Sequence, residues 1–193
     1  DIYNLTAVRT SDQGNRDNFR NIIQADIDTT WSYYDWSGMY TTIGYCNKVL
    51  QHGAEVLEKD KQFTASEWRQ MKAEMVTMRA LSYFYLVRAF KSIPYTTKVV
   101  NSDSDVEYFP QLPVLDVMDS LITDVESVAG QARNRFIKKE ETKGMITNTA
   151  IYALLSDMYL WRASILQGRG ETDKAIADYQ ACIRNSELSI DKL

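Results

Sequence analysis

The chain has 193 residues with a formal net charge of −4, and 45% of its residues are hydrophobic, which is enough apolar material for one domain with a substantial core. The acidic balance argues against nucleic acid or an anionic membrane surface as a partner, because such surfaces attract Lys and Arg that displace their counterions. The small numbers of Pro (three) and Gly (eight) favour long helices over a turn-rich β fold, so we expect an all-α protein.

Residues 1–35 are predicted to form a loop-rich first segment. The polar stretch 9–18, which contains Arg16, has neither helical nor strand periodicity. Apolar residues between positions 19 and 27 favour a short helix at most. Trp31, Tyr33 and Tyr34 then stand among small polar residues rather than in an apolar stripe, which is unusual for aromatic side chains that pack a core.

A first long helix is predicted to begin at Trp36, which we assign to the core. At alternating spacings of four and three, one helical face carries Trp36, Tyr40, Ile43, Asn47, Leu50, Ala54 and Leu57. Asn47 stands in the middle of this face, where an unpaired amide would cost about 1–3 kcal/mol. Its side chain is therefore expected to bond a neighbouring backbone or side chain.

The central helix is predicted within residues 64–94. Thr64 and Glu67 form a capping box at its start, and Pro94 ends it because proline cannot donate to the helix ladder. Two apolar stripes run along it, one of Trp68, Met71, Met75, Met78 and Tyr85 and the other of Val76, Ala80, Tyr83, Val87 and Phe90. A surface helix shows a single stripe, so we expect neighbours packed on both sides of this helix.

The segment 95–111 is predicted to be a polar connector. Within it, residues 101–107 carry oxygen side chains at alternate positions, which invites comparison with a calcium-binding loop. An EF-hand would need Gly at Val106 and a bidentate Glu at Leu112. The segment is therefore interpreted as a solvated acidic loop.

An amphipathic helix is predicted to follow, with Pro113 at its first position. Its apolar stripe consists of Val114, Met118, Leu121, Val125 and Val128. Residues 130–146 then form a basic loop containing Arg133, Arg135, Lys138, Lys139 and Lys143. Such a loop could bind phosphate or a sulfated glycan, but Glu140 and Glu141 interrupt the positive charge, so a solvated loop is the preferred interpretation.

The last two helices are predicted over 150–167 and from Thr172 to about 188. Thr147 or Thr149 caps the first of them, and Gly168 with Gly170 ends it. The pair follows the tetratricopeptide spacing of bulky and small residues at Tyr159, Ala163, Ala175, Tyr179 and Cys182. Small residues at these positions let two antiparallel helices approach closely, so we expect a helical pair of tetratricopeptide-like type.

Residues 78–90, Met-Arg-Ala-Leu-Ser-Tyr-Phe-Tyr-Leu-Val-Arg-Ala-Phe, followed by Ile93-Pro94, resemble the signature helix of the SusD/RagB family of outer-membrane nutrient-binding lipoproteins of Bacteroidetes. The spacing from Trp36 to Asn47 is similar to the family's first helix, and residues 153–175 resemble its last helical pair. One departure is that Lys91-Ser92 stands where the family commonly has Gly before the turn.

This resemblance implies a right-handed superhelical scaffold of antiparallel, tetratricopeptide-like helical pairs. It also implies that residues 1–193 are one helical domain from the N-terminal part of a longer protein, which a lipid at its N-terminus would anchor to the extracellular face of the outer membrane. Such a protein would capture oligosaccharide or polysaccharide and pass it to a SusC-like TonB-dependent transporter in the same membrane.

The sequence offers little for catalysis, and it predicts no catalytic residue, no metal site and no cofactor. His52 is the single histidine, which leaves no histidine-rich metal site, and there is no Gly-x-Ser-x-Gly or glycine-rich phosphate motif. Cys46 and Cys182 lie in helical patterns and are expected to be small packed residues rather than a disulfide. Arg79 and Arg88 lie on the central helix, where each is expected to pair with a carboxylate or an aromatic ring.

Three hypotheses for function remain. The first is glycan binding, with Trp31, Tyr33 and Tyr34 stacking on sugar rings and Arg16 bonding their hydroxyls. The second is a tetratricopeptide-type interaction module that binds a peptide or protein in its groove. The third is a helical hydrolase, which would need two carboxylates about 5–10 Å apart in a cleft.

Overall fold

The computed structural model describes residues 35–99 and 108–190, so the predictions for the first segment and for the acidic loop lie outside the described residues. The chain divides into two compact units, Asp1–Gly38 and Met39–Leu193. The prediction of one domain over 1–193 stays a prediction, since most of the first unit falls outside that description.

The described elements are almost entirely helical, which confirms the all-α prediction. They are α3 (Ser37–Lys59), α4 (Ala65–Phe90), β1 (Ile93–Pro94), β2 (Gln111–Leu112), α5 (Val114–Glu126), α6 (Lys139–Gly144), α7 (Asn148–Gly168) and α8 (Thr172–Ile190). The two strands are two residues each and pair antiparallel, with Ile93 opposite Leu112.

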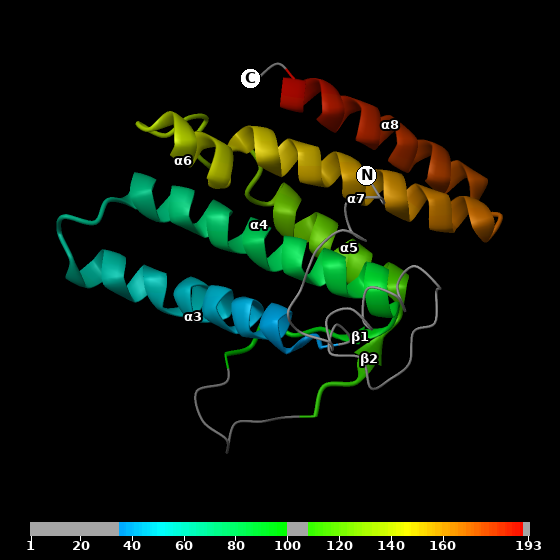
Figure 1. The fold of residues 1–193 in the computed structure, drawn as a ribbon, viewed down its shortest axis with the longest axis horizontal. Coiled ribbons are helices and arrows are strands. Elements are labelled where there is room, and N and C mark those ends of the chain that lie inside the picture. The colour runs from blue at the N-terminus through cyan, green and yellow to red at the C-terminus, as the bar shows by residue number, and fades with distance from the viewer. Residues whose placement is uncertain (1–34, 100–107, 191–193) are drawn as a thin grey trace, which may run out of the picture. The chain divides into compact units, whose positions relative to one another are not determined.

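Within the second unit the long helices lie side by side (Figure 1). On one side of α4, Tyr40 of α3 packs edge-to-face on Tyr83 of α4, with ring centroids 6.0 Å apart. On its other side α4 packs against α5, which also contacts α7. The most extensive packing is between α7 and α8, the antiparallel pair joined at residues 169–171 (Figure 1). The core therefore continues from helix to helix.

The tetratricopeptide-like approach of α7 and α8 rests on small buried residues, as predicted. Ala163 and Ala175 are 0% and 2% exposed, and Tyr159 is buried beside them. Tyr179 and Cys182 are only half-buried. Both cysteines are free thiols, with Cys46 buried.

The expected neighbours lie on both sides of α4, but its first apolar stripe is only partly covered. Val76, Ala80, Tyr83 and Val87 of the second stripe are buried, whereas Met71, Met78 and Tyr85 of the first are 39%, 36% and 56% exposed. The buried arc of α4 is completed instead by polar residues, Thr77, Arg79 and Ser82. Each of these buried polar groups is satisfied: Thr77 and Ser82 bond carbonyls of their own helix, and Arg79 bonds neighbouring helices as described below.

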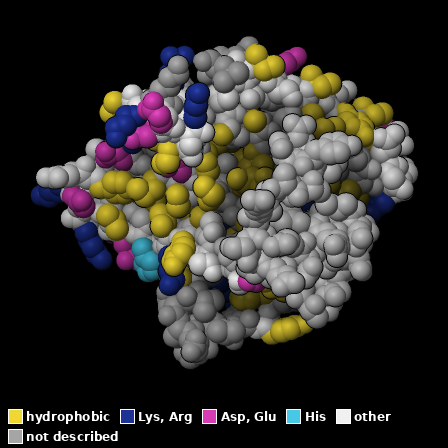
Figure 2. All heavy atoms as spheres, in the orientation of Figure 1, with side chains coloured by type: hydrophobic (Ala, Val, Ile, Leu, Met, Phe, Trp, Pro, Cys, Tyr) yellow, Lys and Arg dark blue, Asp and Glu magenta, His cyan; other side chains and the backbone are white. Residues whose placement is uncertain are grey.

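Figure 2 shows hydrophobic side chains gathered on the face where α3 and α4 lie in Figure 1. On α3 the predicted apolar face is likewise only partly covered, since Ile43 and Asn47 are buried but Ala54 is exposed. Trp36, predicted to be core, precedes the helix and is half-buried. Apolar spacing locates the helices, but it does not say how far along each helix its neighbour extends.

The helix ends follow the sequence signals with small shifts. Thr64 and Glu67 make both bonds of the capping box, as predicted. Pro113 is the N-cap of α5 rather than its first residue, and Thr172 is the first residue of α8 rather than its cap. The loop predicted over 130–146 contains the short helix α6, which begins with Glu140 and Glu141 in its first turn, where their charge suits the helix dipole.

The helix α4 ends on a strained residue. Lys91 has φ 65° and ψ −84°, a conformation that residues with a Cβ rarely adopt. Lys91 belongs to the pair Lys91-Ser92, which stands where the SusD/RagB family commonly has a glycine before the turn. A residue with a Cβ therefore adopts here a conformation that glycine would adopt without strain.

We expect Lys91→Gly to raise the free energy of unfolding by about 1 kcal/mol, because glycine removes the backbone strain and loses only part of the gain through its greater freedom in the unfolded chain. Urea denaturation followed by circular dichroism measures the difference. Lys91→Ala is the matched control, since it removes the charge and keeps the Cβ. Equal stability of the two variants would contradict the strain argument.

A close approach at Gly53 gives a second prediction for stability. A Cβ at Gly53 would lie 2.0 Å from Cζ3 of Trp68, whereas one at Gly44 on the same helix would meet nothing within 4 Å. Gly44→Ala is expected to raise the free energy of unfolding by about 0.5–1 kcal/mol, and Gly53→Ala to lower it by about 1–3 kcal/mol through overpacking. The same denaturation measurement compares them, and a gain at both positions would show that the Trp68 ring moves aside freely.

Candidate functional site

The four residues predicted to bind ligand, Arg16, Trp31, Tyr33 and Tyr34, lie outside the described residues. Their role stays a prediction. What the structure describes is the scaffold that follows them, and its most developed polar feature is a network buried among α3, α4 and α5.

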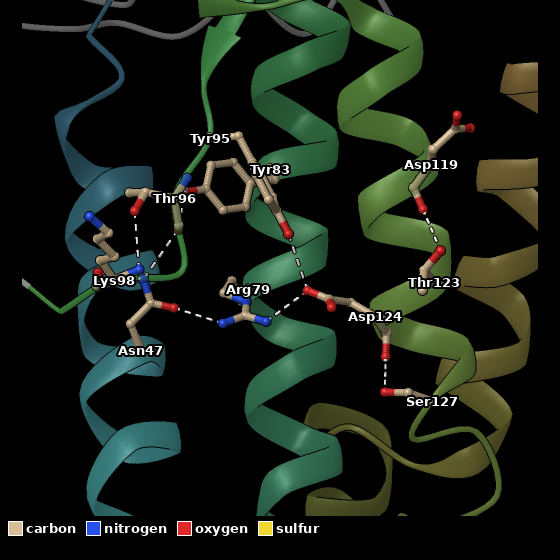
Figure 3. Close-up of polar contacts among 10 residues, drawn as sticks. All are labelled: Asn47, Arg79, Tyr83, Tyr95, Thr96, Lys98, Asp119, Thr123, Asp124 and Ser127. Atoms are coloured by element: carbon tan, nitrogen blue, oxygen red, sulfur yellow. Dashed lines mark hydrogen bonds and ion pairs between the residues drawn. The ribbon is translucent and has the colours of Figure 1, made fainter. Parts of the chain in front are cut away.

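Arg79 of α4 is the centre of this network (Figure 3). Its Nη1 donates to Oδ1 of Asn47 on α3 at 2.8 Å, and its Nη2 donates to Oδ2 of Asp124 on α5 at 2.7 Å. The Arg79 residue is 7% exposed and Asn47 is 2% exposed. A single guanidinium thus links three helices, and a buried cation finds both a carboxylate and an amide oxygen.

The same network holds the chain that leaves α4. Asn47 Nδ2 donates to the carbonyls of Thr96 and Lys98 at 3.4 and 3.2 Å. Tyr83 donates its hydroxyl proton to the Thr96 carbonyl at 2.8 Å and accepts from the Thr96 amide at 3.0 Å. The backbone of residues 96–98 is therefore fixed from two helices before the chain enters the segment that the structure does not describe.

Two more tyrosines complete the arrangement. Tyr95 donates to Oδ2 of Asp124 at 3.2 Å, and Tyr40 donates to the carbonyl of Pro94 at 2.7 Å. Burial is the main cause that raises the pKa of Tyr40 and of Tyr95, and the nearby Asp124 carboxylate raises that of Tyr95 further. Burial likewise raises the pKa of Tyr83. All three hydroxyls stay protonated donors at neutral pH.

The role of this network is to hold helices and the connector after α4 in place. The bonds of Arg79, Asn47 and Tyr83 run to other parts of the protein, so these groups are already engaged before any ligand arrives. The sequence had predicted separately that Asn47 and Arg79 each need a partner; the structure makes them partners of one another. Tyr83, Tyr95 and Thr96 were not predicted to join them, since no local pattern brings residues 95–96 back onto α3 and α4.

A charged hollow of about 450 Å³ lies among α5, α7 and α8. Arg162 of α7 donates from Nε and Nη2 to both carboxylate oxygens of Asp178 and from Nη1 to Asp119, each at 2.7 Å. Lys174 and Glu171 at the rim pair with each other at 2.6 Å. These charges are used within the protein, and we assign the hollow no ligand.

The remaining candidates for chemistry are surface features. His52 is half-exposed with Nδ1 3.5 Å from Oε1 of Glu55, and Arg88 pairs with Asp157 at 3.4 Å while its guanidinium lies 5.1 Å from the centre of the Phe84 ring. The predicted structural pairing of both arginines is thereby confirmed. Among residues 35–99 and 108–190, no group of three or more His, Cys, Asp and Glu is arranged to hold a metal ion. In that same part of the chain no helix has the length and apolar character needed to span a bilayer.

Removing the central charge should destabilise the protein strongly. Arg79→Met leaves Asp124 without its cation and the Asn47 oxygen without a donor, so we expect a loss of about 3 kcal/mol in the free energy of unfolding. Asp124→Asn in the same background should restore part of that loss, with a coupling of about 0.5–3 kcal/mol in the double-mutant cycle. Additive effects of the two substitutions would show that the Arg79–Asp124 ion pair does not stabilise the contact between α4 and α5. Denaturation curves of the four proteins provide the measurement.

Comparison with known proteins identifies this scaffold. A family model described as SusD-like, starch-binding and associating with the outer membrane, matches residues 4–160. SusD-like protein P2 of Formosa agariphila is 23% identical over 172 residues, which are 89% of this chain and 31% of that protein. The chain therefore spans about a third of the length of this curated relative.

Solved structures show the same fold. A SusD superfamily protein from Parabacteroides distasonis is 25% identical with a TM-score of 0.70, over 98% of this chain and 38% of its own. A laminarin-binding SusD-like protein is 25% identical with a TM-score of 0.58, over 74% of this chain and 28% of its own. One from Bacteroides thetaiotaomicron, at 16% identity, has a TM-score of 0.67 over 81% of this chain and 33% of its own. The resemblance seen in the signature helix is confirmed, and the chain belongs to the SusD/RagB family.

Proposed function

We propose that this protein binds glycan without cleaving it. The observation that carries the proposal is the family match over residues 4–160, described as starch-binding, which includes the aromatic cluster at Trp31, Tyr33 and Tyr34. Sugar rings have C–H patches on their faces and hydroxyls at their edges. Flat aromatic rings with a nearby guanidinium such as that of Arg16 can bind both surfaces.

The helical scaffold supports this role by its rigidity. The Arg79 network and the α7–α8 pair fix the helices, so the connector that leaves α4 starts from a fixed position. A non-catalytic protein needs such a scaffold to present stacking side chains with little loss of conformational entropy on binding.

The same proposal extends to location and partner. The family's association with the outer membrane supports a lipid-anchored protein on the extracellular face, which passes its glycan to a SusC-like TonB-dependent transporter. Co-purification of such a transporter with the protein, from outer membranes solubilised in mild detergent, is the expected result. Purification without any TonB-dependent transporter would contradict this part of the proposal and leave glycan binding unaffected.

The family match favours glycan binding over the tetratricopeptide-type interaction module. A solved relative is named as laminarin-binding, and the family description names starch. In the described part of the chain only the α7–α8 pair follows a regular tetratricopeptide spacing, which is fewer than the three or so repeats that such modules need.

Tryptophan fluorescence tests the proposed site. Maltoheptaose and laminarihexaose, as starch-type and laminarin-type probes, are titrated into the protein, and a saturable change is expected with at least one of them. Trp31→Ala should abolish that change, whereas Trp161→Phe should keep it, because Trp161 packs on Phe84 at 5.8 Å. Release of reducing ends is measured on the same samples, and none is expected.

Binding that survives Trp31→Ala would remove the site from the first segment. Two results would contradict the proposed function itself. One is that neither probe binds, and the other is that a bound probe is cleaved. A saturable fluorescence change on titration with peptides in place of the glycans would favour the interaction module.

A further inference from the structure

A second pocket lies against the N-terminal half of α4, beside the segment that precedes and includes α6. Its volume is about 290 Å³, and it is lined by Phe63, Glu67, Gln70, Met71, Glu74, Arg133, Phe136 and Met145. We call it the α4 pocket. Nothing described above assigns it a role, and the basic residues of 130–146 had been interpreted as a solvated loop.

The apolar wall of the α4 pocket consists of two phenylalanines and two methionines. Phe63 and Phe136 are half-buried, and Met71 and Met145 are 39% and 46% exposed. The Arg133 guanidinium lies 5.6 Å from the centre of the Phe136 ring. The pocket thus presents an aromatic face directly beside a hydrogen-bond donor.

Glu67 of the α4 pocket is engaged with Thr64 in the capping box, and the other polar side chains of the lining make no hydrogen bond within the described protein. Among the described residues, the side chains of Gln70, Glu74 and Arg133 make no hydrogen bond and no ion pair. Gln70 and Glu74 are half-buried. Arg133 is exposed, whereas the buried or half-buried polar groups Arg79, Asn47 and Arg162 are all engaged within the protein. The half-buried amide of Gln70 and carboxyl of Glu74 therefore differ from these groups, because each faces the α4 pocket without a hydrogen bond in the protein.

The chemistry of these groups selects the kind of ligand. A carboxylate accepts, a guanidinium donates and an amide does both, so together they suit hydroxyl groups, which both donate and accept. A ligand of net charge would meet a group of its own sign in Glu74 or Arg133. The volume of about 290 Å³ lies just below the roughly 300–1,000 Å³ usual for small-molecule sites, so it suits one ring and not a long ligand.

We propose that the α4 pocket is a second carbohydrate site, in which one sugar ring packs on Phe63 and Phe136 and its hydroxyls bond Gln70, Glu74 and Arg133. The choice of glycan as ligand rests on the proposed function. The site itself uses none of the residues 16 and 31–34. A glycan chain that engages both sites on one molecule would be bound more tightly than at either alone.

The state of Glu74 supports this assignment. Burial raises the pKa of its carboxyl above the ordinary value, and Arg133 only partly lowers it. A raised folded-state pKa means that the folded protein prefers the protonated carboxyl, so stability falls as pH rises through the ordinary glutamate range toward the raised value. Glu74→Gln should therefore raise the melting temperature at pH 7 and leave it nearly unchanged at pH 3.5. A group that costs stability and makes no bond in the folded chain is explained by a ligand that bonds it.

Methionine methyl resonances provide a direct readout of the α4 pocket. The protein is labelled with methyl-¹³C methionine and titrated with maltoheptaose, laminarihexaose and glucose. The methyls of Met71 and Met145 are expected to shift saturably, whereas Met118 and Met158, both 0% exposed, should not. Phe136→Ala and Glu74→Gln should each weaken this response at least tenfold, and Glu58→Gln, at an exposed position of α3, should leave it unchanged.

The two sites are separated by their readouts. Trp31→Ala should abolish the fluorescence change and keep the Met71 and Met145 shifts. Saturable fluorescence without any shift of these methyls overturns the second site and leaves the proposed function standing. Shifts that persist undiminished in both Phe136→Ala and Glu74→Gln also overturn it. The higher melting temperature of Glu74→Gln ensures that its weaker binding is not a failure to fold.

Discussion

The buried guanidinium of Arg79 is the constraint on which the helical scaffold depends. A cation removed from water must be met by oxygen acceptors, and here these come from α3 and α5, one from each side of α4. The three helices are consequently held in one register, since sliding any of them by a turn would leave a charge or an amide without its partner. Apolar packing alone would allow several registers between the helices. The bonds of Arg79 to α3 and α5 can form in only one of them.

The residues around Arg79 also fix the connector that follows α4. Asn47 and Tyr83 hold the backbone at Thr96 and Lys98, and Tyr95 returns to Asp124. The connector after α4 therefore starts from a position that core side chains fix. A connector fixed in this way suits the proposed binding of ligand by the loops.

The helices and their caps could be predicted because their signals are local, as in the capping box of Thr64 and Glu67. The need of Asn47 and Arg79 for partners was also readable, since burial of a polar group in an apolar stripe is visible in the spacing. The exposure of Met71 and Tyr85 was not, because periodicity gives the faces of a helix and not its neighbours. The α4 pocket was out of reach as well: Glu74 and Arg133 are far apart in sequence, and each has an ordinary local context.

The thiol of Cys46 has a consequence for how this protein can be studied. It is 3% exposed on α3, and burial raises its pKa although the nearby Arg79 charge opposes that rise. A protonated, covered thiol does not react with alkylating reagents. The rate at which Cys46 is modified under native conditions therefore reports how often α3 separates from α4. Cys46 is thus a built-in probe of local opening at the contact between these helices, which Arg79 stabilises.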